Sequence, residues 1–423
     1  MNSNTTKNPY VAIACGGTGG HLFPGLAVAG QLQDRGCDVA LLISPKDVDQ
    51  QAVKSALERR SPARREPGNA THPAVETGAP FEVFTLPAVG LQNRNYFSFA
   101  GSFWKSFRTA RKIFRRRRPD AVLAMGGFTS APPVLAAKFF AAKKNRSKTF
   151  LHESNTIPGK ANRFLARFVD EAFVGFPETA ARLKTRKVTP TGTPVRPEFS
   201  PLYAGGRDTA ASKLGLDTNR PVVLVVGGSQ GATGLNTMVL AALPLLAKKN
   251  WQWLHLTGAN DFERVKSAYA TLGINAVVRP FLAEMDLALG VAAAAVSRAG
   301  ASSLAELAAL RLPALLVPFP AAADNHQFFN ARIYALSGAA RLLEQKDATP
   351  EKVAAILTEL VEDHSVRAQM TAALELWHAP KSAEQIAANI LRLSSLSLNA
   401  FSSEVYPGIL TRGQAGPKNI SAV

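Results

Sequence analysis

The chain has 423 residues, 46% of them hydrophobic and 19% charged, so it is long enough for more than one globular domain and too apolar to be disordered. Its two cysteines, Cys15 and Cys37, exclude a disulfide scaffold and a cysteine-based zinc site, and no apolar run reaches membrane-spanning length. The formal net charge is +18, and residues 1–197 carry +17 of it, which predicts an anionic partner for that half: nucleic acid, an anionic membrane or a phosphorylated substrate.

Short apolar runs alternate with helical patterns along most of the chain, which favours βα units and parallel sheets. The first run, 10–15, leads through a glycine cluster into a helical pattern from about Phe23. Further strands are predicted at 38–43, 81–86, 121–125, 149–152 and 172–174. After a restart at 221–226, strands are predicted at 253–257, 276–278, 292–296 and 314–317. The sequence therefore predicts an α/β fold with two doubly wound, Rossmann-like domains and a ligand-binding cleft between them.

Composition marks the predicted boundaries. The stretch 190–197 is dense in Pro and Gly and is predicted to link an N-terminal domain, 1–197, to a second domain, 198–393. A polar, Arg-rich insertion is expected at about 46–80, and the Ser- and Gly-rich tail 394–423 is expected to be flexible. The short polar start of the chain is not typical of a signal peptide, so we expect a cytosolic protein.

A glycine turn, Gly16–Gly17–Thr18–Gly19–Gly20, joins the first strand to the first helix and ends in His21. Such a turn brings backbone N–H groups and the positive end of a helix close to a phosphate. It is neither a dinucleotide fingerprint nor a P-loop. His21 is interpreted as a base or donor at this turn, with a helix-capping or core histidine as the alternative. A second turn carries Gly126 and Gly127, and two such turns in the basic half suit a diphosphate-bearing substrate.

The turn 227–231 opens the second domain and also matches G-x-S-x-G, the nucleophile elbow of α/β-hydrolases, with Ser229 at its centre. A hydrolase would need an acid and a histidine downstream. The candidates are Asp261 or Asp286, with His326 or His364. The elbow belongs midway through one sheet, however, whereas this turn follows the strand that restarts a second domain, so the hydrolase is kept as an alternative.

Three polar patterns have two interpretations each. Ser303-x-x-Glu306 is a capping box, which we favour on pattern alone, although Glu306 could instead accept hydrogen bonds from a ribose diol. The polar loop 324–330 suits sugar hydroxyls or a solvated turn. Asp47-x-Asp49 resembles a metal-binding tripeptide of some glycosyltransferases, but it opens the polar insertion and we assign it no metal role.

Aromatic and basic residues interleave over 96–118, with a helical pattern from about Phe99. Phe103, Phe107 and Phe114 could be ordinary core, but such helices also lie at anionic membrane surfaces. A non-catalytic membrane-binding module therefore remains an alternative. We predict no nucleic-acid partner, because no nucleic-acid-binding module is recognisable.

Several motifs occur in a fixed order: GGTGGH, MGGFTS, HESN, GTPVRPEF, VVGGSQGA, RAGASSLAE and HQFFNA. From about residue 11 to 391 the chain resembles the MurG family, which transfers N-acetylglucosamine from UDP-N-acetylglucosamine to lipid I in peptidoglycan synthesis. The resemblance implies a GT-B architecture, an inverting transfer to the C4 hydroxyl of the muramic acid in lipid I, and lipid II as product. It implies peripheral location at the cytoplasmic face of the bacterial membrane, with other cell-wall enzymes as further partners.

The resemblance also assigns site residues. The acceptor would bind the N-terminal domain, its diphosphate at Gly16, Gly17, Gly126 and Gly127. The donor would contact Thr18, Gly19, Gly20, Asn155, Arg196, Ser229, Leu282, Ala301, Ser302, Ser303, Leu304, Ala305, Glu306 and Gln327. The resemblance reverses our preference for Glu306 and implies a ribose ligand. His21 is predicted as the general base, with Glu153 in reserve, and no metal or other cofactor is predicted.

Overall fold

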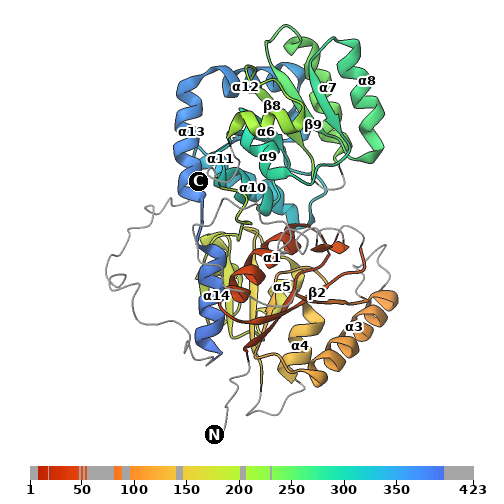
Figure 1. Cartoon of the computed structure of the whole chain (residues 1–423), viewed down its shortest axis with the longest axis vertical. Coiled ribbons are helices and arrows are strands. Elements are labelled where there is room, and N and C mark those ends of the chain that lie inside the picture. The colour runs from red at the N-terminus through yellow and green to blue at the C-terminus, as the bar shows by residue number, and fades with distance from the viewer. Residues whose placement is uncertain are drawn as a thin grey trace, which may run out of the picture.

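The computed structural model describes residues 8–17, 19–46, 49–50, 53–54, 81–87, 96–139, 146–200, 206–228 and 231–394. They form two domains, each a parallel sheet covered by helices on both faces, joined end to end (Figure 1). The predicted doubly wound α/β fold is confirmed. The expected insertion at 46–80 and tail at 394–423 fall almost entirely outside the described residues.

The first sheet has the order β3-β2-β1-β4-β5-β6-β7. Its strands are β1 (Tyr10–Ala14), β2 (Asp38–Ile43), β3 (Glu82–Thr85), β4 (Ala121–Ala124), β5 (Lys148–Glu153), β6 (Glu171–Val174) and β7 (Val188–Pro190). Its helices are α1 (Gly19–Gln33), α3 (Tyr96–Arg116), α4 (Ala131–Phe139) and α5 (Lys160–Leu165), followed by a 3₁₀ helix at Pro177–Arg182. Successive residues of β1 point to opposite faces of the sheet. Val11 and Ile13 belong to the core on one face, and Ala12 and Ala14 belong to the core on the other face. Strands buried on both faces need continuous apolar runs, which is why the sequence revealed them.

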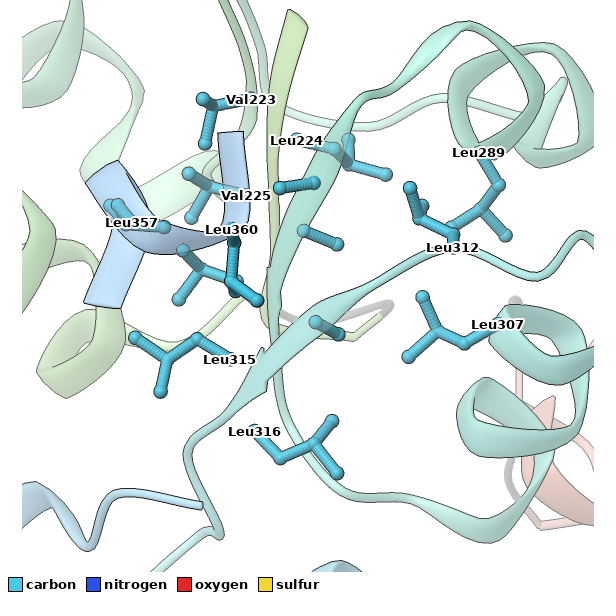
Figure 2. Close-up of a cluster of buried hydrophobic side chains, with 14 of the residues drawn as sticks. Val223, Leu224, Val225, Leu289, Leu307, Leu312, Leu315, Leu316, Leu357 and Leu360 are labelled. Carbon is cyan, nitrogen blue, oxygen red and sulfur yellow. The ribbon is translucent and has the colours of Figure 1, made fainter. Parts of the chain in front are cut away.

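The second sheet has the order β10-β9-β8-β11-β12-β13. Its strands are β8 (Val222–Val226), β9 (Gln252–Leu256), β10 (Ala276–Arg279), β11 (Ala294–Ser297), β12 (Ala314–Leu316) and β13 (Arg341–Leu342). Its helices are α6 (Arg207–Leu214), α7 (Thr233–Leu246), α8 (Phe262–Thr271), α9 (Met285–Val291), α10 (Ala301–Ala309), α11 (His326–Leu336), α12 (Pro350–Glu362) and α13 (His364–Trp377). Val223 and Val225 point toward Leu357 and Leu360 of α12, whereas Leu224 points to the opposite face (Figure 2).

The last helix, α14 (Ser382–Leu393), does not pack with the second domain, to which the range 198–393 assigned it. It lies beside α1 on the first sheet (Figure 1), where Ile386, Ala387 and Ile390 join the core that contains Val11. These side chains recur at helical spacing and form one apolar stripe, which is buried only against a sheet face with room for another helix. The chain therefore crosses between the domains twice.

The two crossing segments meet at Gly192 and Ala379. The Gly192 carbonyl accepts hydrogen bonds from Ser382 Oγ (2.9 Å) and His152 Nε2 (3.0 Å). Gly192 has φ +76°, and a Cβ there would lie 2.3 Å from the Ala379 Cβ. Burial lowers the pKa of His152 to about 4, so its imidazole is neutral and its Nε2 carries the donated proton. The two segments that connect the domains are therefore held together at this point.

Candidate functional site

The side chain of Asp49 holds the first glycine turn in place. Gly17 has φ +117°, and its N–H donates to Asp49 Oδ2 at 2.7 Å, while Ser44 donates to the same oxygen. Lys46 Nζ donates to the Gly17 carbonyl at 2.7 Å. Gly16 has no space for a side chain, because a Cβ would lie 2.2 Å from the Ser44 nitrogen. The Gly17 peptide is therefore engaged within the protein, and Asp49 anchors the turn.

The second glycine turn leaves the space that the His21 side chain occupies. Gly126 and Gly127 have φ of +104° and +75°. A Cβ on Gly126 would lie 2.8 Å from His21 Cδ2, and one on Gly127 would lie 3.2 Å from His21 Nδ1. Thr129 Oγ1 donates to the Gly16 carbonyl at 2.6 Å and so joins the two turns. From the sequence we expected these glycines to bind the acceptor diphosphate. In the structure they leave room for the His21 imidazole.

The environment of His21 favours its neutral form. Its pKa is lowered chiefly by burial, and His326 and Lys46 lower it further. The carboxylates of Glu153 and Asp49 act in the opposite direction and raise it. A neutral imidazole carries one nitrogen lone pair, which is the feature that a general base needs.

Glu153 is buried at the end of β5, and each of its carboxylate oxygens accepts two hydrogen bonds. Oε1 accepts from the N–H and the Nδ2 of Asn155, at 2.9 and 3.1 Å. Oε2 accepts from the N–H of Gly159 and the Nδ2 of Asn162, both at 2.9 Å. These bonds satisfy four donors of the loop and of helix α5 that follow β5. The carboxylate therefore orders that loop and has no readily available lone pair for a substrate proton.

The capping-box interpretation of Ser303 and Glu306 is wrong. Helix α10 begins at Ala301, its N-cap is the extended residue Gly300, and no side chain caps it. Ser303 lies inside the helix because Gly300 already supplies the backbone conformation at which the helix starts. Glu306 is thereby released from any capping role.

Glu306 lies in a cluster of charged side chains. Burial raises its pKa to about 7; Arg196 lowers it, and Glu198 and Asp286 raise it. Arg196 Nη2 is 3.9 Å from Glu306 Oε1, and its Nη1 is 3.1 Å from Glu198 Oε1. The Arg196 guanidinium lies over the ring of Phe23 at 4.2 Å, which fixes it between the domains. Burial, Glu198 and Asp286 therefore favour the protonated form of Glu306, and Arg196 favours the charged form.

Several predicted site residues meet across the domain boundary. Ser302 Oγ donates to the Gly20 carbonyl at 3.0 Å, and Asn155 Oδ1 accepts from Asn330 Nδ2 at 3.0 Å. On α11, Gln327 Oε1 accepts the Phe319 N–H at 2.9 Å. Gly19 lies at the start of α1, Leu282 is buried after the exposed Phe281, and Leu304 and Ala305 lie within α10. Thr18 and Ser229 lie outside the described residues.

Sequence reasoning missed four polar residues that build this region: Lys46, Asp49, Asn162 and Asn330. Asn330 belongs to a motif that was noticed, but nothing in its pattern distinguishes it from Gln327 one turn earlier. Asp49 was considered only as a metal ligand. In the described part of the chain, no group of three or more His, Cys, Asp or Glu side chains is arranged to hold a metal ion.

Helix α3 lies along one edge of the first domain (Figure 1). Phe107 and Phe114 are buried in the core, Phe103 is half-buried against it, and Trp104 is 57% exposed. Phe97 is 94% exposed. The basic residues on the exposed side of the helix are Lys105, Arg108, Lys112, Arg115 and Arg116. The described helices include none that is both long and apolar enough to cross a membrane.

Arg117 has a different role from its basic neighbours. It pairs with Asp38, lies 3.5 Å from Glu82 Oε1, and stacks over the Tyr10 ring at 4.0 Å. The basic run after α3 is therefore not one uniform solvated face.

Comparison with known domain families shows which protein family the chain belongs to. The N-terminal domain of glycosyltransferase family 28 matches residues 11–174, and the C-terminal domain of that family matches residues 222–388. The chain belongs to glycosyltransferase family 28. Membership in this family favours a transferase over the hydrolase alternative. Consistent with that, Asp261 is bonded to Arg264 and Asn236, and His364 accepts from Arg367.

Curated members of family 28 extend the match over nearly the whole chain. A UDP-N-acetylglucosamine–N-acetylmuramyl-(pentapeptide) pyrophosphoryl-undecaprenol N-acetylglucosamine transferase of Anaeromyxobacter sp. (strain Fw109-5) is 36% identical over 382 residues, covering 89% of this chain and 91% of its own. A protein of the same name from Xanthomonas axonopodis pv. citri is 36% identical over 385 residues, covering 90% and 82%. The chain is therefore a member of this group of transferases, which is the MurG family, as the motifs predicted.

Solved structures agree with this family 28 assignment. The crystal structure of Acinetobacter baumannii MurG has a TM-score of 0.66 and 25% identity, covering 91% of this chain and 100% of that one. Arabidopsis thaliana UGT89C1, solved with quercetin, has a TM-score of 0.63 at 18% identity, with 91% and 100% coverage. The latter likeness concerns the fold alone.

Proposed function

We propose that this chain transfers N-acetylglucosamine from UDP-N-acetylglucosamine to the C4 hydroxyl of the muramic acid in lipid I, with inversion at the anomeric carbon. The observation that carries the proposal is the 36% identity over 89% of the chain to a transferase of that name. The geometry supports it: the first turn of α1, which carries His21, contacts helix α10 of the second domain directly, through Gly20 and Ser302.

In this proposal His21 is the general base. The acceptor oxygen forms a bond to the anomeric carbon, the bond to the UDP oxygen breaks, and the hydroxyl proton moves to the imidazole. A neutral, oriented histidine suits this step, and a well-placed base contributes roughly 10²–10⁴-fold in rate. Glu153 is assigned an ordering role instead, because its oxygens already accept four N–H groups.

The second domain is assigned the donor, and the first the acceptor. Glu306 accepts hydrogen bonds from the ribose hydroxyls, and Arg196 favours its charged form. The start of α10 is assigned to the donor diphosphate, where its N–H groups and the helix end stabilise the departing charge. Ser229, which lies outside the described residues, is assigned to the same group on its motif alone. Lys46, beside the first glycine turn, supplies positive charge for the lipid diphosphate.

The deciding experiment is a transfer assay with UDP-N-acetylglucosamine and a soluble lipid I analogue. The proposal expects release of UDP that depends on the acceptor, with one disaccharide product formed per UDP. Release of UDP without acceptor, abolished by Ser229→Ala, would instead support a hydrolase. No turnover of either kind would favour a non-catalytic membrane-binding module.

We further propose that α3 docks on the anionic cytoplasmic face of the membrane and brings the first domain to lipid I. The exposed aromatic side chains Phe97 and Trp104 offer apolar area to the interface, and the neighbouring cations add salt-sensitive attraction. Phe107, which the sequence had offered for this role, is buried in the core and does not contribute.

Co-sedimentation with liposomes tests the role of α3. The variant Phe97→Ser with Trp104→Ser should lose binding at all salt concentrations, because it removes the apolar contact. Changing Lys105, Arg108 and Lys112 to Gln should reduce binding mainly at low salt. Both variants should retain transfer to the soluble analogue. Equal binding of the wild type to neutral and anionic liposomes would contradict the electrostatic part of the proposal.

A further inference from the structure

The buried side-chain amide of Asn330 lies in the contact between the two domains. Asn330 of α11 is 0% exposed, and its Oδ1 accepts from the Thr156 N–H (3.0 Å) and the Thr156 Oγ1–H (2.9 Å). Its Nδ2 donates to Asn155 Oδ1 (3.0 Å) and to the Ala299 carbonyl (3.1 Å). Its amide hydrogens and lone pairs are all used. Three of these four bonds cross from the second domain to the first.

The chemistry of the partners fixes the direction of these bonds. The Glu153 carboxylate only accepts, so the Nδ2 of Asn155 faces it and the Oδ1 of Asn155 faces Asn330. The Thr156 N–H only donates, so Asn330 presents Oδ1 to it and Nδ2 to the Ala299 carbonyl. Turning either amide over would place like groups against each other. The network therefore has one arrangement, and it exists only while the domains are in contact.

The network reaches both parts of the proposed site. On the first domain, Glu153 also accepts from Asn162 Nδ2, which would lie 3.3 Å from a Cβ on Gly126, the residue that seats His21. On the second domain, Ala299 lies two residues before α10, the helix that carries Glu306. Hydrogen bonds thus run from the residue before the donor helix to Asn162, and Asn162 lies next to Gly126, which borders the His21 ring.

We propose that Asn330 is a positioning residue that sets the spacing between His21 and the donor helix by holding Asn155 and Thr156 against the second domain. This inference rests on the proposed function for its kinetic consequence, but not for its structural one. Without the amide, the domains would still meet through the apolar contact of Phe176 with Tyr334 and Trp377, which is not directional. The other contacts would include exposed bonds, such as the ion pair of Arg163 with Asp324 at 2.7 Å. Exposed pairs contribute little.

The kinetic test uses the full chain with the soluble acceptor. Asn330→Ala should raise the KM for UDP-N-acetylglucosamine about tenfold or more, with the acceptor KM within about twofold. Thr156→Val removes one hydrogen bond and should raise the donor KM a few-fold, whereas Thr156→Ser should behave as the wild type. Asp324→Asn breaks the exposed interdomain pair and serves as the matched control, with a donor KM within about twofold of the wild type.

The structural test measures the distance between spin labels placed at Lys184 and Lys266, which are exposed on the first and second domains. The native Cys15 and Cys37 are buried, so labels attach to the introduced cysteines. Asn330→Ala should broaden the distance distribution, and saturating UDP should narrow it again. The same distribution as the wild type, or an unchanged donor KM, would overturn the proposal.

If Asn330→Ala does not fold, the variants Thr156→Val and Thr156→Ser test the proposal in its place. Equal KM values for the donor in these two variants would overturn it. Failure of the proposed function has a different signature. The wild type would then show no transfer, while the distance measurement with UDP alone would still report on Asn330.

Discussion

At the scale of single residues, the site depends on which polar groups are already occupied. Glu153 and Gly17 both looked available in the sequence, yet the first accepts four hydrogen bonds and the second donates to Asp49. His21 differs from these two residues. Burial favours its neutral form, and Gly126 and Gly127 leave room for its ring. Motifs identified the residues, but not their partners, because hydrogen bonds between distant segments leave no local pattern in a sequence.

The role of His21 gives the first prediction. His21→Ala should lower kcat by about 10²-fold or more, since the step loses its base, while the affinity for UDP stays within a few-fold. Single-turnover kinetics and calorimetric binding of UDP measure the two effects. Near wild-type turnover would remove His21 from the mechanism. Glu153→Gln is the comparison: it should cost stability, because its amide cannot accept all four bonds.

Glu306 gives a prediction about pH. Its folded-state pKa of about 7 lies above the ordinary value of 4.5, so the folded protein takes up a proton as pH falls below 7. Since the charged form is the better acceptor for ribose hydroxyls, the affinity for UDP-N-acetylglucosamine should rise between pH 6 and 8. The contribution of this group to folding stability runs the other way and decreases as pH rises from about 4.5 to 7.

Calorimetry in buffers of different ionisation enthalpy measures this linkage, because donor binding should release protons below pH 7. Glu306→Gln is the matched variant, with weaker binding and a flat profile over the same range. If that variant keeps the slope of the wild type, the titrating group is another one, and Asp286, whose pKa burial also raises, becomes the candidate.

At the scale of elements, the strands were predicted well because their burial on both faces demands apolar runs. Two strands were missed: β7, which was partly included in the predicted linker, and β13, which has only two residues. Helix α3 was found at nearly its true bounds. The position of α14 was not predictable from its own pattern, since an amphipathic stripe shows that a helix is buried but not against which sheet.

The packing of α14 gives a prediction about stability. Ile386 is fully buried in the core of the first domain, so Ile386→Ala should destabilise that domain by about 2–5 kcal/mol. Thermal unfolding followed by calorimetry should show the loss in the transition of the first domain, with the second domain unchanged. A loss confined to the second domain would contradict the packing. Glu384→Ala, on the exposed side of α14, is the control and should have little effect.

At the scale of the whole molecule, the contacts that hold the two parallel-sheet domains together include the Asn330 amide, the Ser302–Gly20 bond and the Arg196 guanidinium beside Phe23. The buried ring of Phe176 adds apolar packing against Tyr334 and Trp377. The prediction of two domains came from a repeat of the βα pattern. Their contact could not be predicted, because it joins residues from α1, the loop after β5, α10 and α11 that are far apart in the chain.

The crossing of the two interdomain segments gives the last prediction. Gly192→Ala should destabilise the protein and alter the relation between the domains, because its Cβ would lie 2.3 Å from that of Ala379. Gly215→Ala is a matched control: it has the same φ of +76°, but nothing lies within 4 Å of its Cβ. The difference in unfolding free energy between the two variants isolates the crowding from the backbone strain. Equal losses would mean that the crossing tolerates a side chain.

The return of α14 to the first domain also bears on how the protein is made. Synthesis proceeds from the N-terminus, and domains generally fold as units while the chain emerges. Here the first sheet is complete in sequence at β7, but the side of its core that receives Ile386 and Ile390 stays uncovered until the entire second domain has been translated. The domain that begins folding first is therefore the last to be finished. A nascent or truncated chain that lacks α14 would present this apolar surface to chaperones and to other chains.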